Sequence, residues 1–227
     1  MRILSLNQPL QYDGLHIDCR SLLEIDAETA QTYDYILIHG GDGSIRRAVT
    51  HLQSLPQIPA LILNPTGSFN VMAKLHKTPP LMSVLERLSK GESIGTTEVP
   101  YYRMNEMCFL FSAGNMGDAQ HIFLAETFRF GVLKKGAAKY FLALLFLLPV
   151  HIVMTPFMLL SARRFFIFTP LSFIARFGTF YGKVPKRLEI DLDNKYNIVE
   201  LDGDLVTVAD SRLHISAGGT VRFVTAI

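Results

Sequence analysis

The stretch His39-Gly40-Gly41-Asp42-Gly43-Ser44-Ile45 decides the fold class of this chain. It ends a short apolar run that begins at Tyr35, and it precedes a segment to Leu55 whose apolar residues have helical spacing. Three glycines permit a tight turn in which backbone N–H groups can approach an anion closely. The start of the following helix adds a partial positive charge, which suits phosphate. We therefore predict a strand, a phosphate-binding turn and a helix.

A second polar turn, Asn64-Pro65-Thr66-Gly67-Ser68-Phe69-Asn70, ends the next apolar run, which begins at Ala60. Another helical pattern follows from Leu81 to Lys90, and Gly91 is its expected stop. The alternation of strands and helices predicts a parallel sheet with helices on its faces. Open sheets of this kind bind ligands at the carboxyl ends of their strands, where both turns would lie. Two such turns can hold one nucleotide from two sides.

The alternation of strand and helix patterns ends near Pro100, where we place a domain boundary. Residues 1–100 form the predicted α/β nucleotide-binding domain. Residues 101–227 form a predicted shorter, β-rich, lipid-binding domain of sandwich type, with a helix at 118–128 and an apolar helical segment at 136–180. Toward the end of the chain, alternating apolar and charged residues predict antiparallel strands.

The most apolar stretch suggests a contact with a membrane. Residues 140–160 form a charge-free run of 21 residues, although Pro149 and Pro156 argue against one straight spanning helix. Basic residues and phenylalanines are mixed through residues 163–187, as in segments that bind an anionic bilayer surface. The alternative is a core helix with ordinary surface charge. We favour a segment that docks on or dips into the bilayer.

Composition limits the remaining classes of protein. The net charge of +2 is too small for the basic stripe of a nucleic-acid-binding protein. An apolar fraction of 49% and a mean hydropathy of +0.25 indicate a folded chain with excess apolar surface. Cys19 and Cys108 have neither disulfide nor metal-ligand spacing. The start of the chain has no signal-peptide pattern, so we expect a cytoplasmic protein.

Four segments resemble the catalytic domain of the diacylglycerol kinase and sphingosine kinase family. Gly40 to Ile45 is similar to its Gly-Gly-Asp-Gly-Thr motif, and Pro65 to Lys74 to its Pro-x-Gly-Thr-Gly-Asn…Ala-Arg motif. Ser112 to Ala119 resembles its Gly-x-Gly-x-Asp-Ala segment, and Asp202-Gly203-Asp204 its late Asp-Gly-Glu. The segments come in the family's order.

The resemblance implies an ATP-dependent lipid kinase whose active site lies between an α/β ATP-binding domain and a β-sandwich. It also implies Mg²⁺, and a lipid hydroxyl such as that of diacylglycerol as the acceptor. Asp204 would be the general base, with Asp202 and Asp42 supporting base or metal, and the metal ligands stay unknown. We expect a peripheral protein at the inner face of the membrane, and we leave open whether it forms a homodimer. The residues expected to hold ATP are Gly40, Gly41, Asp42, Gly43, Ser44, Gly67, Ser68 and Asn70.

Several positions depart from the family pattern and keep alternatives open. Arg46-Arg47 stands where the family has Asn-Glu, and Phe69 replaces a glycine. One alternative is a non-catalytic relative that binds nucleotide or lipid, and another is a soluble NAD kinase, which has a similar fold and glycine motif. By themselves, Asp202-Gly203 also suits a plain hairpin turn, and Asp42 could serve only to fix its turn.

Overall fold

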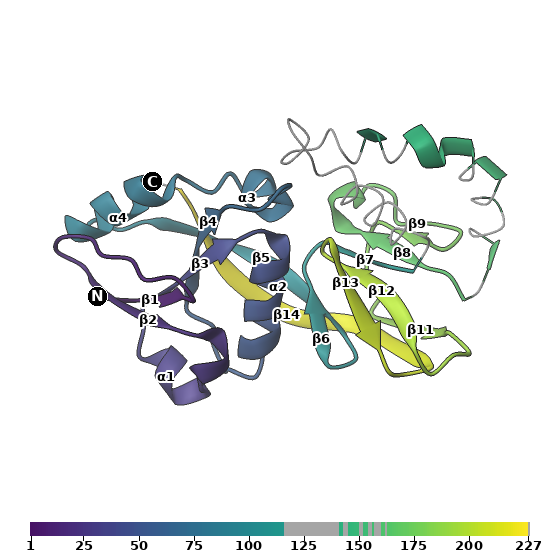
Figure 1. Cartoon of the computed structure of the whole chain (residues 1–227), viewed down its shortest axis with the longest axis horizontal. Coiled ribbons are helices and arrows are strands. Elements are labelled where there is room, and N and C mark those ends of the chain that lie inside the picture. Colours follow the sequence, from purple (N-terminus) through teal and green to yellow (C-terminus); the bar gives the residue numbers. More distant parts are fainter. Residues whose placement is uncertain are drawn as a thin grey trace. The chain divides into compact units, whose positions relative to one another are not determined.

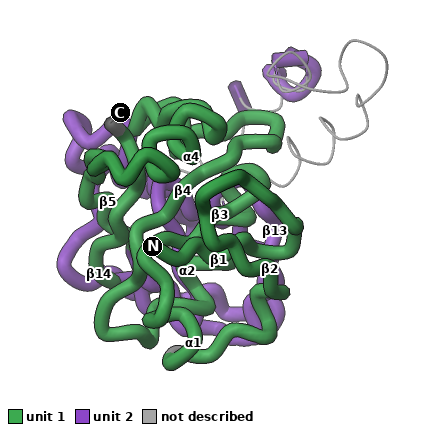
Figure 2. The backbone as a smooth tube through the Cα atoms, turned by 90° about the vertical axis from the view of Figure 1, so that its left-hand side faces the viewer, with its two compact units in different colours: residues 1–101, 218–227 green, residues 102–217 purple. Residues whose placement is uncertain are grey.

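The described part of the chain forms two compact units. The computed structural model describes residues 1–115, 141–142, 145–149, 152–153, 156, 160–161 and 163–226. Unit 1 consists of residues 1–101 with 218–227, and unit 2 of residues 102–217 (Figure 2). We expected residues 101–227 to form one domain, but residues 218–227 belong to unit 1. The reason is that the last strand of the chain continues into the sheet of that unit.

Unit 1 is a mainly parallel sheet with flanking helices (Figure 1). Its strands are β1 (Arg2–Leu6), β2 (His16–Arg20), β3 (Tyr35–Gly40), β4 (Ala60–Pro65), β5 (Gly95–Met104) and β14 (Arg212–Ala226), and its helices are η1 (Leu22–Glu24), α1 (Ala27–Gln31), α2 (Asp42–Leu52), α3 (Val71–Leu75) and α4 (Leu81–Ser89). The strand order is β2-β1-β3-β4-β14-β5, and β1, β2, β3 and β4 run parallel. This arrangement confirms the predicted α/β class.

The core of unit 1 explains why these residues form a sheet covered by helices. Alternate residues of a strand face opposite sides of its sheet, so a strand covered on both sides is apolar throughout. Leu37 and Ile62 pack against the apolar side of α4, while Ile36 and Leu61 are equally buried toward the other face. Helix α2 lies on the opposite side of the sheet from α4 (Figure 2). It buries the predicted apolar stripe, Ile45, Ala48, Val49 and Leu52.

Unit 2 is rich in β-structure, as predicted. Its strands, besides the adjoining parts of β5 and β14, are β6 (Met107–Phe109), β7 (Ser112–Gly114), β8 (Phe166–Phe168), β9 (Arg176–Phe177), β10 (Phe180–Tyr181), β11 (Arg187–Asp191), β12 (Asn197–Leu201) and β13 (Asp204–Val208), with the short helix η3 (Thr169–Leu171). Six of them form a sheet of order β13-β12-β7-β8-β10-β9, and β11 pairs antiparallel with β14. Residues such as Phe109, Phe165 and Val199 form a core of their own.

The expected apolar helical segment within 136–180 is only partly supported. The described residues at 141–142, 145–149 and 152–153 are helical, but residues 166–181 contain β8, η3, β9 and β10. The β-branched and aromatic residues of β8 pair with β7, and β10 pairs with β8, instead of continuing a helix. The helix expected at 118–128 lies outside the described residues. Among the described residues, no helix has the length and apolar character needed to cross a bilayer.

Candidate functional site

The two glycine turns of unit 1 lie side by side at the carboxyl ends of β3 and β4 (Figure 1). In the parallel register of these strands, His39 is opposite Asn64 and Gly40 is opposite Pro65. The N–H of Thr66 donates a hydrogen bond to the carbonyl oxygen of Gly40 at 3.1 Å. The structure therefore brings together two motifs whose paired residues are 25 positions apart in the sequence, at the sheet edge where ligands are expected.

Glycine is required where the backbones of the two turns meet. A Cβ atom on Gly67 would lie 2.6 Å from the Cα atom of Gly41, so neither residue can carry a side chain without moving the other turn. Gly40 has φ of +143°, and a Cβ there would lie 2.2 Å from Oγ of Ser44. The glycines thus permit close backbone packing between the two turns.

Asp42 connects the first glycine turn by hydrogen bonds to α3, the helix that follows the second glycine turn. Its side chain is only 7% exposed. Its two carboxylate oxygens accept hydrogen bonds from the N–H groups of Val71, at 2.8 Å, and Met72, at 2.9 Å. Burial raises the pKa of Asp42 above its usual range, while these two backbone donors and the nearby charge of Lys74 lower it. In this geometry the carboxylate satisfies the first N–H groups of α3.

The remaining predicted ATP-binding residues shape the turns or stand at their surface. Asn70 has φ of +50°, and its side chain accepts from the N–H of Gly67 at 3.0 Å and donates to the carbonyl of Gly67 at 2.8 Å. Ser68 is half-buried beside it. Helix α2 begins at Asp42, so Gly43 and Ser44 lie in its first turn, where the N–H of Ser44 donates to the carbonyl oxygen of Gly41 at 3.0 Å. Such a helix start can bind a phosphate.

The late Asp-Gly motif forms a hairpin turn in unit 2. Leu201 and Asp204 pair across the turn between β12 and β13, and the residues between them, Asp202 and Gly203, have φ of +49° and +85°. Positive φ at both central residues is the geometry that favours Asp-Gly in two-residue hairpins. Asp204, the predicted general base, is the first residue of β13 and is half-buried.

Asp202 holds this hairpin against the segment between β6 and β7. Only 3% of the residue is exposed, and its carboxylate accepts from the N–H groups of Leu110, Phe111 and Ser112 at 2.7, 2.9 and 3.0 Å. Its own N–H donates to the carbonyl oxygen of Ser112 at 3.0 Å. As in Asp42, both oxygens of this carboxylate accept hydrogen bonds from backbone N–H groups.

Glu200 is a second buried carboxylate that the sequence did not single out. It is 6% exposed, accepts a hydrogen bond from Oγ of Ser112 at 2.8 Å and accepts another from the N–H of Gly203. Its position on β12, two residues before Asp202, looks like an ordinary outward strand position in the sequence. Only the pairing of β12 with β7 places it beneath the turn.

The structure describes part of the predicted segment Ser112 to Ala119. Ser112 to Gly114 form β7, and the side chain of Asn115 accepts from the N–H of Phe165 at 2.9 Å and donates to the carbonyl of Arg163 at 2.9 Å. Residues 116–119 lie outside the described part of the chain. Among the described residues, no group of three or more His, Cys, Asp or Glu side chains could hold a metal ion.

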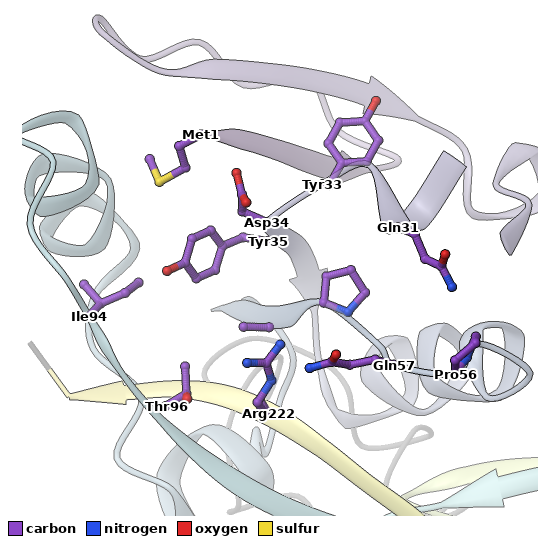
Figure 3. A pocket seen from close by; sticks show the side chains of 12 residues that line it. Met1, Gln31, Tyr33, Asp34, Tyr35, Pro56, Gln57, Ile94, Thr96 and Arg222 are labelled. Atoms are coloured by element: carbon purple, nitrogen blue, oxygen red, sulfur yellow. The ribbon is translucent and has the colours of Figure 1, made fainter. Parts of the chain in front are cut away.

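A cavity of about 1000 Å³ lies at the opposite, amino-terminal edge of the unit 1 sheet (Figure 3). Tyr35 and Ala60, at the starts of β3 and β4, line it, and so does Arg222 of β14. Burial, and then the charge of Asp34, raises the pKa of Tyr35, and Arg222 opposes this. Neither glycine turn lines the cavity, so it is separate from the candidate phosphate site.

Comparison with known proteins points to one family. Residues 16–97, which are 82 of the 227 residues, match the model of the diacylglycerol kinase catalytic domain. No curated protein matches the chain. The structure of a diacylglycerol kinase from Bacillus anthracis is 20% identical, covers 57% of this chain and 54% of its own, and has a TM-score of 0.40. This chain thus spans about half the length of that kinase.

An NAD kinase from Archaeoglobus fulgidus, solved in complex with ATP, covers 100% of this chain and 94% of its own at 13% identity, with a TM-score of 0.47. Neither structure is similar enough to carry an argument about activity. The family model is the stronger finding, because its match includes the strand, both glycine turns and the helix between them. Residues 16–97 are therefore similar to the diacylglycerol kinase catalytic domain.

Proposed function

We propose that the protein is a lipid kinase that transfers the γ-phosphate of ATP to the hydroxyl of diacylglycerol or a related lipid alcohol. One observation carries this proposal. Two glycine turns, in backbone contact and joined by Asp42, lie at the carboxyl edge of a parallel sheet within the residues that match the family. A transferase of phosphate needs such a rigid anion cradle, because positioning and charge neutralisation provide most of its rate.

The ATP phosphates would lie against the start of α2 and the facing turn. The N–H of Gly43 in the first turn of α2 and the hydroxyl of Ser68 are the proposed donors. Arg47 is exposed, and its guanidinium reaches Oγ of Ser44 at 3.4 Å, so a positive charge stands beside the cradle. Bound Mg²⁺ would add charge neutralisation on the phosphates, but we assign it no protein ligand.

In the proposed reaction, the lipid hydroxyl oxygen forms a bond to the γ-phosphorus, and the bond from that phosphorus to the β–γ bridging oxygen breaks. ADP leaves with the electron pair of that bond. The hydroxyl proton passes to the carboxylate of Asp204, as general base. Asp204 suits this role because it follows a tight turn that Asp202 anchors through three backbone hydrogen bonds. Asp42 and Asp202 are then positioning residues.

We propose that unit 2 contributes the contact with the membrane. The segment from η3 to β9 leaves Phe173 and Phe177 exposed, at 81% and 66%, with the cation of Arg176 next to the latter. Large apolar side chains of residues 141–160 are exposed as well, among them Phe141, Phe146 and Ile152. Exposed aromatic residues beside basic ones suit the interface of an anionic bilayer, where a lipid substrate would be taken up.

The proposal is tested by incubating the protein with Mg²⁺ and ATP labelled at its γ-phosphate, in mixed micelles that contain diacylglycerol or other lipid alcohols. A parallel reaction contains NAD and no lipid. We expect label in a lipid product and none in NADP. Label in NADP alone would identify an NAD kinase instead.

A non-catalytic relative is the second candidate. It is favoured by the way in which Asp42 and Asp202 place their carboxylate oxygens on backbone N–H groups, which is what a purely structural pair of carboxylates would do. Its signature would be saturable ATP binding by calorimetry together with no labelled product from any lipid.

A further inference from the structure

Three polar side chains form a hydrogen-bonded chain directly beneath the glycine turns. Nε2 of His39, the residue before Gly40, lies 3.0 Å from Oγ of Ser5 at the end of β1. Nδ1 of His39 lies 2.9 Å from the side-chain amide nitrogen of Asn64 on β4. The hydroxyl of Ser5 also donates to the carbonyl oxygen of Gln8 at 2.5 Å. The three side chains come from three neighbouring strands of the sheet.

The direction of each hydrogen bond follows from the partners. A carbonyl can only accept, so the single hydrogen of the Ser5 hydroxyl goes to Gln8. Oγ of Ser5 can then only accept from His39, which places a hydrogen on Nε2. In a neutral imidazole the other nitrogen is an acceptor, and the amide of Asn64 donates to it. Burial lowers the pKa of His39, in agreement with the neutral form.

The same geometry resembles a nucleophile, base and orienting residue, but it cannot work as one. Ser5 is completely buried, so its hydroxyl has no access to a substrate. The imidazole also donates to that hydroxyl instead of taking its proton, which is the reverse of a general base. The chain of hydrogen bonds is therefore a structural coupling and not a hydrolytic site.

This coupling connects the segment after β1 with both glycine turns. Gln8 lies in that segment, His39 adjoins Gly40, and Asn64 adjoins the second turn. Turns rich in glycine lose much conformational freedom when they bind a ligand, so holding them in place beforehand strengthens binding. We propose that His39 is a positioning residue which, as a neutral imidazole, holds the phosphate turn in its nucleotide-binding geometry. The proposal rests on the proposed ATP-binding function.

The experiment compares wild type with His39→Gln and His39→Phe in two measurements on the full chain. The first is the dissociation constant of ATP, measured by calorimetry. The second is backbone hydrogen exchange at residues 6–9 and 40–44, measured without nucleotide. The glutamine amide can still donate near the position of Nε2, whereas phenylalanine removes both hydrogen bonds. We expect ATP affinity to fall about tenfold in His39→Phe and less in His39→Gln, with faster exchange in the same order.

His76→Gln is the matched control, because His76 is also half-buried in unit 1 and has a pKa lowered by burial, but contacts Phe223 instead of either turn. His76→Gln should change neither the dissociation constant of ATP nor the hydrogen exchange at residues 6–9 and 40–44. Asn64→Leu, which removes the donor to Nδ1, is the second variant if His39→Phe does not fold.

The outcomes separate this proposal from the function on which it rests. A folded wild type that does not bind ATP overturns the proposed function. A wild type that binds ATP, with affinity and exchange unchanged in His39→Phe or in Asn64→Leu, overturns the positioning role alone. Faster exchange confined to the two segments, together with weaker ATP binding, supports it.

Discussion

At the scale of single residues, Asp42 and Asp202 have the same kind of environment in two different units. Each is nearly completely buried, and each accepts backbone hydrogen bonds from a segment that is distant in the sequence. A carboxylate is the strongest acceptor available for the unpaired N–H groups at the start of a helix or in a turn. Both aspartates therefore fix the backbone next to residues that are proposed to act on substrate.

The substitution Asp42→Asn tests this role. An asparagine keeps one acceptor but places an NH₂ donor against the N–H of Val71 or Met72. We expect the free energy of unfolding of unit 1 to fall by about 1–3 kcal/mol, measured by urea denaturation. Asp13→Asn, at an exposed position, is the control and should change it by less than about 0.5 kcal/mol. Equal midpoints for the two variants would refute the positioning role of Asp42.

Histidine burial gives unit 1 a pH dependence of stability. Burial lowers the pKa of both His39 and His76 below the ordinary value of 6.5. The unfolded chain then binds protons at a higher pH than the folded one, so this stability is present above pH 6.5 and is lost as pH falls through the lowered pKa values. We expect the urea midpoint of the wild type to fall between about pH 7 and about pH 5.

The double variant His39→Gln with His76→Gln removes these two titrations. Its urea midpoint should change less over the same pH range than that of the wild type. A slope as steep as that of the wild type would assign the pH dependence to other groups.

At the scale of elements, the contact between the two turns explains why the phosphate site needs glycine on both strands. The φ angle of Gly67 lies outside the left-handed region, so alanine is compatible with its backbone conformation. Its Cβ would nevertheless lie 2.6 Å from Cα of Gly41 and 2.8 Å from Oδ1 of Asn70. The effect of Gly67→Ala is therefore purely steric.

We expect Gly67→Ala to force the turns apart, to destabilise unit 1 by about 1–3 kcal/mol and to abolish measurable ATP binding. Ser68→Ala, one residue away, adds no atom and should leave stability unchanged while weakening ATP binding only modestly. Thermal unfolding and calorimetric titration of both variants measure these effects. Wild-type ATP affinity in Gly67→Ala would mean that the two turns do not act together.

The exposed phenylalanines between η3 and the end of β9 lead to a prediction about membrane binding. Replacing both Phe173 and Phe177 with serine removes exposed aromatic surface without touching the core. We expect this variant to bind anionic liposomes at least several-fold more weakly than the wild type in sedimentation assays. Ile198→Ser, another exposed apolar position of unit 2, is the control. Equal binding by the wild type and both variants would place the membrane contact elsewhere.

At the scale of the whole molecule, local patterns predicted the first half of the chain well. The glycine turns, the strands β3 and β4 that precede them and the helices α2 and α4 lie within a few residues of their predicted places, for example α4 at Leu81–Ser89, whereas the short helix α3 was not predicted. These elements form βα units whose periodicity and turn residues are local in the sequence. The carboxyl edge of the sheet, and with it the candidate phosphate site, followed from the same local signals.

What could not be predicted depends on pairing between distant segments. The strand β14 returns to unit 1 and pairs with β4, although its sequence continues the β-pattern of unit 2. Likewise, the partners of Asp42 lie 29 and 30 residues away, and those of Asp202 lie 90 or more residues away. A motif identifies such a carboxylate but does not tell whether it faces a substrate or the backbone.

The general-base role of Asp204 is the most direct test of the complete account. Asp204→Asn preserves shape in the hairpin but cannot accept the lipid proton, and Asp191→Asn makes the same change at an exposed position of β11. The measurement is the rate of γ-phosphate transfer from ATP to lipid at saturating substrates. We predict transfer by the wild type and by Asp191→Asn, and a loss of about a hundredfold or more in Asp204→Asn. No transfer to any lipid by a folded, ATP-binding wild type would contradict the account.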